Sequence, residues 1–414
     1  MKGNRSSSKS TLALFGGEPV SRRPVQVPPY PPVSKATARK LANVYLSRRW
    51  SFNGPIEQQF AREYAAYHGA KHGIFMANGT VTLQCGLAAC GVGRGDEVIV
   101  PALTWIATAM APYYLGAKPV FVDIEPTTMC LDPAKFAAAI TRRTRAVIPV
   151  HLYGGLADLD SILRIARKHK LAVIEDCAHM QGGKWRGRGV GSWGDVGSFS
   201  FQQSKTLPCG EGGICLTNDD KLADKLYRLK HIGYAANTTQ GQAASGPEPG
   251  LICYNYRATD FQAVILRDDL PNLRDRIAGY NRSADRLARH LKGIPGIHVQ
   301  ARGKQASPQG YYAWMVMLDE GPAAQVPLAR LREALAAEGA PVFTGTYGPV
   351  YKHMLWNLRP GEYRIDGGSC PVSEDLATKR AIGVMHYLLG ADKATIDVIG
   401  QALAKVLRNA AALL

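Results

Sequence analysis

Three short segments of the sequence carry residue types that could support chemistry. The segment GSFSFQQSKTLPCGEGG places Lys205 just after an apolar, strand-like run, among serine, glutamine and glycine residues. A lysine amine in such a setting could form a Schiff base with a carbonyl compound. Most lysines are solvated surface charges, so this segment alone leaves both roles open.

The second segment, VIEDCAH, ends an apolar run with Glu175 and Asp176. An unpaired carboxylate buried at this point is costly, so we expect a cationic or N–H partner for Asp176. Successive strand residues point to opposite faces, which predicts that Glu175 faces away, as a surface or salt-bridge residue. The alternative role for Asp176 is the N-cap of a following helix.

The third segment, ANGT, lies between a strand-like run and a helix-like run. The N–H groups of a helix N-terminus are unpaired, so Asn78, Gly79 and Thr80 could hold a phosphate, or could simply cap the helix. A phosphate cup, a buried carboxylate and a lysine together predict a site for pyridoxal 5'-phosphate. In such a site the carboxylate keeps the pyridine nitrogen protonated, while the lysine binds the aldehyde and later shuttles a proton.

The elements that must position these segments alternate regularly between residues 73 and 217. Apolar strand-like runs such as EVIVPA, PVFVDI and LAVIEDC are separated by helix-like segments. This alternation predicts an α/β fold with a mainly parallel sheet that helices cover on both faces. Ligands of such sheets bind beyond the carboxyl ends of the strands.

The length of 414 residues and the changes in composition predict more than one domain. Residues 1–34 include the run PVQVPPYPP and predict an extended, basic N-terminal arm. Residues 35–265 are predicted to form a large cofactor-binding domain, and residues 266–414 a smaller C-terminal α+β domain. Helices are predicted at 35–49 and 55–69.

Charge, hydropathy and cysteine usage narrow the function classes. The net charge is +17, but ten basic residues and one acidic residue fall within residues 1–50, so nucleic-acid binding is not predicted. No apolar run reaches the roughly 18 residues of a membrane span, and the N-terminal LALF is too short for a signal peptide. The eight cysteines form no CxxC pair. We therefore expect a cytoplasmic protein with reduced thiols, no membrane association and no metal site.

The ordered series of motifs resembles the DegT/DnrJ/EryC1/StrS family of pyridoxal-phosphate-dependent sugar aminotransferases. The resemblance extends from about residue 16 to the C-terminus and rests on WSFNGPIEQQFAREYAAYHG, ANGT, GVGRGDEVIVPALTWIATA, IEDCAHMQGG, GSFSFQQSKTLPCGEGG and YNYRATDFQA. It implies the transferase fold type I, with a large domain around a mainly parallel sheet and a smaller C-terminal α+β domain. It also implies a homodimer with shared active sites.

The resemblance further implies a role for each matching residue. Lys205 and Asp176 are the implied catalytic pair, the lysine bound to the cofactor aldehyde and the carboxylate paired with the pyridine nitrogen. Trp105 is implied to pack against the cofactor ring. The other implied cofactor contacts are Gly79, Thr80 and Ser200 at the phosphate, His179 at the opposite ring face or phenolic oxygen, and Asn255 at the phosphate of the neighbouring subunit's cofactor.

Within the family, FSFQQSK, CAHM and MHYLLG are most similar to the cyclitol branch. Its members move an amino group, typically from L-glutamine, onto scyllo-inosose or its 2-deoxy form in aminoglycoside biosynthesis. This similarity makes Gln203 and His386 candidate substrate contacts, although an ordinary packed histidine is the alternative for His386. Pro208, Cys209 and Cys253 depart from the family pattern and put the local loop shape in question.

Three other functions remain open at this point. One is a pyridoxal-phosphate-dependent dehydratase, although such relatives generally carry histidine in place of the lysine. A nucleotide-linked keto-sugar aminotransferase shares the motifs, but its diphosphate substrate needs basic residues at the mouth of the site. A non-enzymatic regulatory relative would use the basic N-terminus and would not need Lys205.

Overall fold

The computed structural model describes residues 11–236, 238–239, 241–242 and 246–414. Its largest element is an eight-stranded sheet with the order β1-β9-β8-β5-β4-β2-β3-β13. Neighbouring strands are parallel except that β9 runs antiparallel to β1 and β8. The strands are β1 (His72–Met76), β2 (Glu97–Pro101), β3 (Lys118–Val122), β4 (Thr144–Val147), β5 (Ala172–Asp176), β8 (Val196–Ser200), β9 (Gly213–Thr217) and β13 (Arg364–Ile365). The predicted α/β fold with a mainly parallel central sheet is confirmed.

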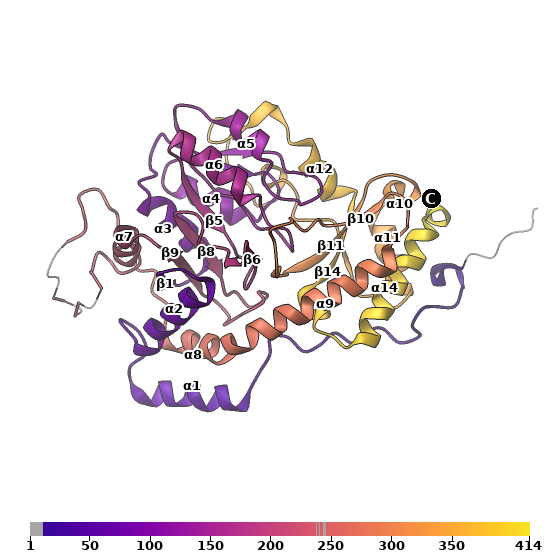
Figure 1. The fold of residues 1–414 in the computed structure, drawn as a ribbon, viewed down its shortest axis with the longest axis horizontal. Helices are drawn as coiled ribbons and strands as arrows, with labels where there is room; N and C mark the ends of the chain where they lie inside the picture. Colours follow the sequence, from indigo (N-terminus) through magenta and orange to yellow (C-terminus); the bar gives the residue numbers. More distant parts are fainter. Residues whose placement is uncertain (1–10, 237, 240, 243–245) are drawn as a thin grey trace, which may run out of the picture.

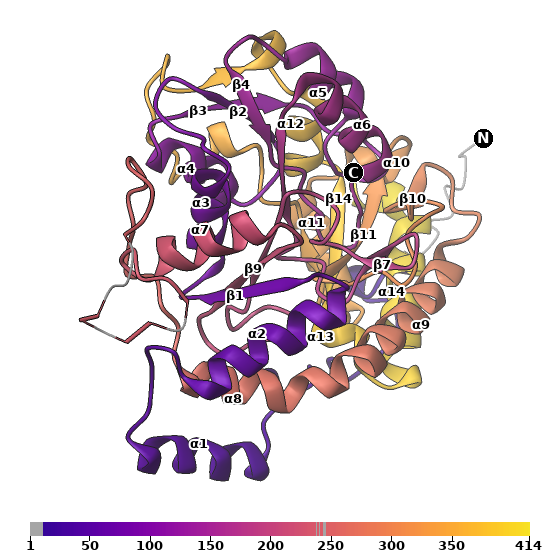
Figure 2. The same ribbon diagram turned by 60° about the vertical axis from the view of Figure 1, so that its left-hand side comes forward.

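Helices cover both faces of this sheet, as Figures 1 and 2 show. The apolar strands have two buried sides: Val98 and Val100 belong to the core on one face, and Ile99 belongs to the core on the other. One face carries α3 (Gly79–Ala89), α4 (Ile106–Tyr114) and α7 (Asp220–Lys230), and the other carries α2 (Pro55–His68), α5 (Pro133–Ala139) and α6 (Leu159–His169). Burial on both faces explains why these strands read as continuous apolar runs.

Aromatic packing supports the strand ends where the candidate residues lie. Phe60, Phe75 and Phe201 are fully buried on α2, on β1 and just after β8. The ring centroid of Phe60 lies 5.1 Å from that of Phe75 and 5.4 Å from that of Phe201, in edge-to-face contacts. Such contacts contribute about 0.5–1.5 kcal/mol each beyond area burial. They fix the start of the segment that leads to Lys205.

A second sheet lies beside the first, in the right half of Figure 1. Its four antiparallel strands have the order β10-β11-β14-β12. They are β10 (Ile297–Val299), β11 (Ala313–Leu318), β12 (Phe343–Thr344) and β14 (Ala381–Met385), with α9 (Leu273–Leu291), α11 (Leu328–Ala337) and α14 (Lys393–Arg408) packed around them. This agrees with the α+β character predicted for the C-terminal part.

The single helix expected from about residue 260 to residue 292 is divided in the structure. It consists of α8 (Asp260–Asp269), a 3-10 turn (Leu270–Asn272) and α9. Pro271 lies in the turn, where its ring and missing N–H disfavour a continuous α-helix. Downstream, β13 returns from the C-terminal part to pair with β3 of the large sheet. The proposed boundaries at residues 34 and 265 stay predictions.

In its described part, residues 11–34, the N-terminal arm contains one short 3-10 helix (Ala13–Phe15) and leads into α1 (Lys35–Ser47). Residues 1–10 of the predicted arm lie outside the described residues. The Ser34 hydroxyl caps this helix by accepting a hydrogen bond from the Ala36 backbone N–H at 3.1 Å. In Figure 1 the indigo segment before α1 runs from the region of α11 and α14 along the lower edge of the molecule. The arm therefore connects the second sheet's helices with the helices of the large domain.

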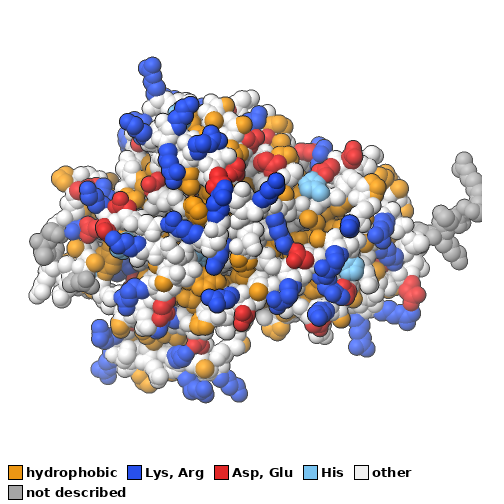
Figure 3. Space-filling view, viewed as in Figure 1, with side chains coloured by type: hydrophobic (Ala, Val, Ile, Leu, Met, Phe, Trp, Pro, Cys, Tyr) orange, Lys and Arg blue, Asp and Glu red, His pale blue; other side chains and the backbone are white. Residues whose placement is uncertain are grey.

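The surface shows no single basic stripe on the face seen in Figure 3, where Lys and Arg side chains are spread among acidic ones. None of the helices in the described part of the chain is long and apolar enough to cross a membrane. The cysteines are free thiols, and five of the eight are buried.

Candidate active site

A cavity of about 1010 Å³ opens beyond the carboxyl ends of β5 and β8 and the N-terminus of α3. The structure brings eight of the eleven site residues named from the sequence into its wall. They are Asn78, Gly79, Thr80, Trp105, Asp176, His179, Ser200 and Lys205. Gln203, Asn255 and His386 lie outside this wall. The cavity is the candidate active site because the lysine, the carboxylate and the helix N-terminus meet there.

Lys205 is half-buried in a turn that follows β8. Its Nζ lies 4.5 Å from the centroid of the Tyr312 ring, so an aromatic face replaces part of its hydration. Burial lowers the pKa of the Lys205 amine to about 8, although the charge of Asp176 opposes this shift. Compared with an ordinary lysine, the neutral amine at pH 7 is more abundant by roughly two orders of magnitude.

Asp176 is the last residue of β5 and is 5% exposed. Its Oδ2 accepts a hydrogen bond from the Thr108 hydroxyl at 2.8 Å, and its Oδ1 accepts one from the Ala178 backbone N–H at 3.2 Å. Burial raises the pKa of Asp176, and these bonds and Lys205 act in the opposite direction. The expected N–H partner is present. A turn follows instead of a helix, so the helix N-cap alternative is wrong.

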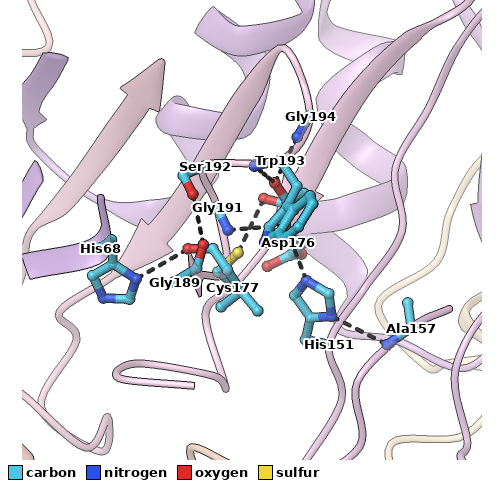
Figure 4. A network of polar contacts seen from close by, with 12 residues as sticks. His68, His151, Ala157, Asp176, Cys177, Gly189, Gly191, Ser192, Trp193 and Gly194 are labelled. Atoms are coloured by element: carbon cyan, nitrogen blue, oxygen red, sulfur yellow. Dashed lines mark hydrogen bonds and ion pairs between the residues drawn. The ribbon is translucent and has the colours of Figure 1, made fainter. Parts of the chain in front are cut away.

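Glu175 faces away from Asp176 but is fully buried, so the surface alternative is wrong, and its carboxylate lies against the imidazole of His151 instead. His151 Nε2 lies 3.3 Å from the carboxylate, and the backbone N–H groups of Gly191, Trp193 and Gly194 each donate to it at 2.8 Å (Figure 4). Burial would raise the pKa of Glu175, but these hydrogen bonds outweigh burial and lower it. The carboxylate ties β5 to the loop before β8.

The same network accounts for a cluster of metal-ligand atom types. Ligand atoms of His151, Glu175 and Cys177 lie within 4.8 Å of one another and are buried. The two carboxylate oxygens already accept the four hydrogen bonds described above. The arrangement therefore serves as a structural brace between the strand and the loop.

The N-terminus of α3 approaches the end of β8 closely. Asn78 Oδ1 caps the helix by accepting hydrogen bonds from the backbone N–H groups of Thr80 and Val81, both at 3.1 Å. A Cβ on Gly79 would lie 2.7 Å from the Cβ of Ser200, so only glycine fits there without displacement. The capped helix start is thus present. The glycine leaves exposed backbone, and two hydroxyl-bearing residues stand beside it.

The opposite wall of the cavity is aromatic. Trp105 is 46% exposed, and its ring centroid is 5.3 Å from that of Tyr347, in an edge-to-face contact. His179 stacks on Tyr312 with ring centroids 3.9 Å apart, and the Tyr347 hydroxyl lies 3.4 Å from His179 Nε2. Burial lowers the pKa of His179 well below its ordinary value, so the ring is neutral at pH 7.

Sequence reasoning missed the aromatic residues of the second sheet region. Tyr312 directly precedes β11, and Tyr347 lies in a loop after β12. Each belongs to a stretch typical of an ordinary strand or loop, without a local motif. Only the packing of the second sheet against the first brings them to Lys205, and the sequence offered no signal for that contact.

The three remaining candidates occupy other positions. Gln203 is exposed in the turn before Lys205. His386 is fully buried, and its Nε2 lies 2.8 Å from the Ser204 carbonyl oxygen. This is the position expected of an ordinary packed histidine. Asn255 is exposed and pairs with His231 in an isolated antiparallel bridge. Their implied contacts with substrate and with a second subunit's cofactor stay predictions.

Comparisons with known proteins agree with this geometry. The DegT/DnrJ/EryC1/StrS aminotransferase family matches residues 33–401. The chain belongs to this family. It is an aminotransferase, as expected from the motifs, and the non-enzymatic alternative finds no support.

Curated relatives cover nearly the whole chain. An L-glutamine:2-deoxy-scyllo-inosose aminotransferase of Streptoalloteichus tenebrarius is 38% identical, over 96% of this chain and 98% of the relative. An L-glutamine:scyllo-inosose aminotransferase of Streptomyces griseus is also 38% identical, over 97% and 98%. The solved structure of 3-amino-5-hydroxybenzoic acid synthase has a TM-score of 0.81 at 29% identity, over 92% of this chain and 100% of that one. These similarities cover both sheets of the fold.

Proposed function

We propose that this aminotransferase binds pyridoxal 5'-phosphate in the cavity between the two sheets. Three features of the cavity fit that group. The buried carboxylate of Asp176 has a raised pKa and suits a protonated pyridine nitrogen as its partner. The glycine backbone beside Thr80 and Ser200, at a helix N-terminus, suits a phosphate. The half-buried amine of Lys205 suits the aldehyde.

When bound, the cofactor withdraws electrons from the substrate carbon that carries the amino group, which makes its proton acidic. Asp176 maintains that effect by stabilising positive charge on the ring nitrogen. The Lys205 amine, with a pKa of about 8, can take up and return a proton at that carbon near neutral pH. His179 stays neutral and adds no second positive charge beside Lys205. Trp105 contributes an aromatic surface for the ring.

For the substrates, we propose L-glutamine as amino donor and a keto-cyclitol of the scyllo-inosose type as acceptor, in aminocyclitol biosynthesis. The printed activities of the full-length relatives support this choice. The chemistry of the cavity supports it as well: among the described lining residues, Lys205 is the only Lys or Arg, and Glu211 adds negative charge. A nucleotide diphosphate would find no arginine among these residues to form paired hydrogen bonds with its phosphates. A polyhydroxylated ring would find tyrosine, serine and threonine hydroxyls as hydrogen-bond partners.

The exposed segment around Asn255 supports a proposal about the assembly. We propose a homodimer in which this segment reaches the partner's cofactor. Tyr254 and Tyr256 line the cavity, whereas the side chain of Ile252 is 71% exposed and that of Ile232, which lies beside this segment, is 54% exposed. Large exposed apolar residues next to an active site suit burial against a second copy.

The deciding experiment for the reaction uses the purified full-length chain loaded with pyridoxal 5'-phosphate. We expect amine transfer from L-glutamine to scyllo-inosose or its 2-deoxy form, measured by mass spectrometry of the aminocyclitol. Lys205→Ala should abolish turnover, while Lys168→Ala, at an exposed position of α6, should leave it intact. Turnover of a nucleotide-linked keto-sugar with no cyclitol turnover would overturn the substrate assignment.

A cytoplasmic location is expected for such an enzyme and stays a prediction.

The shared site can be tested by mixing two inactive chains. If Asn255 serves the partner's site, a dimer of one Lys205→Ala chain and one Asn255→Asp chain contains one fully native site. Random mixing should then restore about a quarter of the wild-type activity, since half of the dimers are mixed and each holds one good site. No recovery in a sample whose mixed dimers are confirmed by native mass spectrometry would place Asn255 in its own subunit's site.

A further inference from the structure

Side chains from outside the large sheet hold the turn that carries Lys205. Three consecutive backbone carbonyls, those of residues 204–206, accept hydrogen bonds from donors far away in the sequence. His386 of α13 (His386–Leu389) donates to the first at 2.8 Å, the Tyr30 hydroxyl to the second, and Arg276 of α9 to the third at 2.9 Å. The carbonyl that Tyr30 contacts is that of Lys205 itself.

The arm that carries Tyr30 is fixed well before it reaches the turn. Glu338 is fully buried at the end of α11, and its carboxylate accepts hydrogen bonds from the backbone N–H groups of Ala13 at 2.9 Å and Val20 at 3.0 Å. Lys405 Nζ lies 2.8 Å from the same carboxylate and balances its charge. The arm is therefore anchored at one end to the second sheet's helices, and Tyr30 contacts the lysine turn further along.

Bonding geometry assigns the donors at the turn. A carbonyl oxygen can only accept a hydrogen bond. The Tyr30 hydroxyl and His386 Nε2 therefore each carry a proton and act as the donors of their two separate bonds. The Nδ1 of His386 is then left to accept from the Tyr280 hydroxyl, 3.4 Å away. Burial lowers the pKa of His386 to about 4, so this tautomer persists through the neutral range. The Tyr30 ring packs edge-on against His386, with centroids 4.9 Å apart.

We propose that Tyr30 is a positioning residue that fixes the backbone of Lys205 and thereby the place of its amine in the cavity. This inference rests on the proposed role of Lys205. Among the described residues, the amine has no hydrogen-bond partner, only the Tyr312 ring beside it. Its location therefore depends on where the turn holds the start of the flexible side chain. A displacement of about 1 Å at a reacting group can lower a rate by roughly 100-fold. A single hydrogen bond that holds this carbonyl in place can therefore change the rate of the reaction.

Tyr30 lies outside the cavity wall, which separates this role from substrate binding. Tyr30→Phe removes the hydroxyl and keeps the ring against His386. We expect kcat to fall about 5–10-fold in both half-reactions, with KM for glutamine and acceptor within about 2-fold of wild type. The matched control is Tyr387→Phe. The Tyr387 ring lies 6.0 Å from the Tyr30 ring, but its hydroxyl makes no hydrogen bond within the described part of the chain.

A second readout needs neither substrate nor cofactor. In the full-length chain freed of cofactor, the pH dependence of Lys205 acylation by acetic anhydride, followed by mass spectrometry, reports the pKa of the amine. Burial depresses this pKa, so a loosened turn that admits water should raise it, by about 0.5 unit in Tyr30→Phe. This result stands even if the proposed acceptor is wrong, and the labelling midpoint of Tyr387→Phe should match wild type.

Replacement of Tyr30 by 4-aminophenylalanine keeps a donor at the same ring position and should restore both kcat and the labelling midpoint. The proposal is overturned if the Tyr30→Phe variant, shown to be folded by a thermal-unfolding measurement, keeps the wild-type kcat and the wild-type midpoint of Lys205 labelling. It is equally overturned if the variant raises KM at constant kcat, since that pattern belongs to a substrate contact.

Discussion

The two walls of the active-site cavity differ in chemistry. The wall formed by the large sheet is polar, buried and saturated with hydrogen bonds; Asp176 is 5% exposed and Ser200 is 8% exposed. The opposite wall is aromatic and more open, with Trp105 46% exposed and tyrosines contributed from beside the second sheet. A rigid polar wall suits a permanently held cofactor. On the aromatic wall, the Trp105 ring suits contact with the cofactor ring, whereas the tyrosine hydroxyls suit an exchanging polyol.

The largest expected effect is on the polar wall, at Asp176. Asp176→Asn keeps the shape but removes the negative charge that balances a protonated ring nitrogen. Losing one partner of a buried charge pair costs about 3–5 kcal/mol, so kcat should fall roughly 1000-fold. Single-turnover kinetics with glutamine measure this loss. The control Asp319→Asn, at a half-exposed side chain, should leave the rate unchanged. A loss of less than 10-fold would contradict the pairing.

The next effect concerns the contact between α3 and β8. Gly79→Ala places a Cβ 2.7 Å from the Ser200 Cβ, and such overpacking costs about 1–3 kcal/mol. We expect affinity for pyridoxal phosphate to fall by 10-fold to 100-fold, as measured by equilibrium titration. Gly93→Ala is the matched control because a Cβ there meets nothing within 4 Å. Equal affinities in the two variants would show that the phosphate lies elsewhere.

Residues of the cavity also differ in how readily the sequence revealed them, and those that follow strands of the large sheet, Trp105 and His179 on the aromatic wall included, were predicted. Asp176, Lys205 and Gly79 stand at strand and helix ends, where local motifs report both the element and the exposed position. Tyr312 and Tyr347 have no such motif, because they reach the cavity only through the docking of one sheet on the other. The alternation of apolar runs was enough to predict the large sheet, since each strand is buried on both faces.

Two differences in the fold have similar causes. The antiparallel direction of β9 depends on a return of the chain that apolar patterning does not encode. The pairing of β13 with β3 joins segments more than two hundred residues apart, and only tertiary packing brings them together. The strand alternation correctly predicted the side of β5 on which Glu175 lies. It did not predict that the loop of residues 191–194 packs over this side chain and buries it.

The rate at which Lys205, on the polar wall, captures the cofactor is expected to change about tenfold with pH. The neutral amine of Lys205 is the form that attacks the cofactor aldehyde, and its pKa is about 8. Below that value most of the amine is protonated, so the rate of cofactor capture should rise about tenfold between pH 7 and pH 9 and then level off. Stopped-flow absorbance on the cofactor-free chain measures the rate. A midpoint near 10.4 would mean that the amine is fully hydrated.

The smallest effect is expected on the aromatic wall, at Tyr347. Its hydroxyl lies 3.4 Å from His179 Nε2, and burial raises its pKa, so it stays protonated and available to a substrate hydroxyl. Tyr347→Phe removes one neutral hydrogen bond, worth about 0.5–1.5 kcal/mol, while keeping the ring against Trp105. The KM of the cyclitol should therefore rise about 2-fold to 10-fold, while the glutamine half-reaction changes less than 2-fold. Tyr113→Phe, outside the cavity on α4, is the control. If both half-reactions weaken equally, the Tyr347 hydroxyl does not act on the cyclitol alone, and its assignment as a contact of the acceptor is wrong.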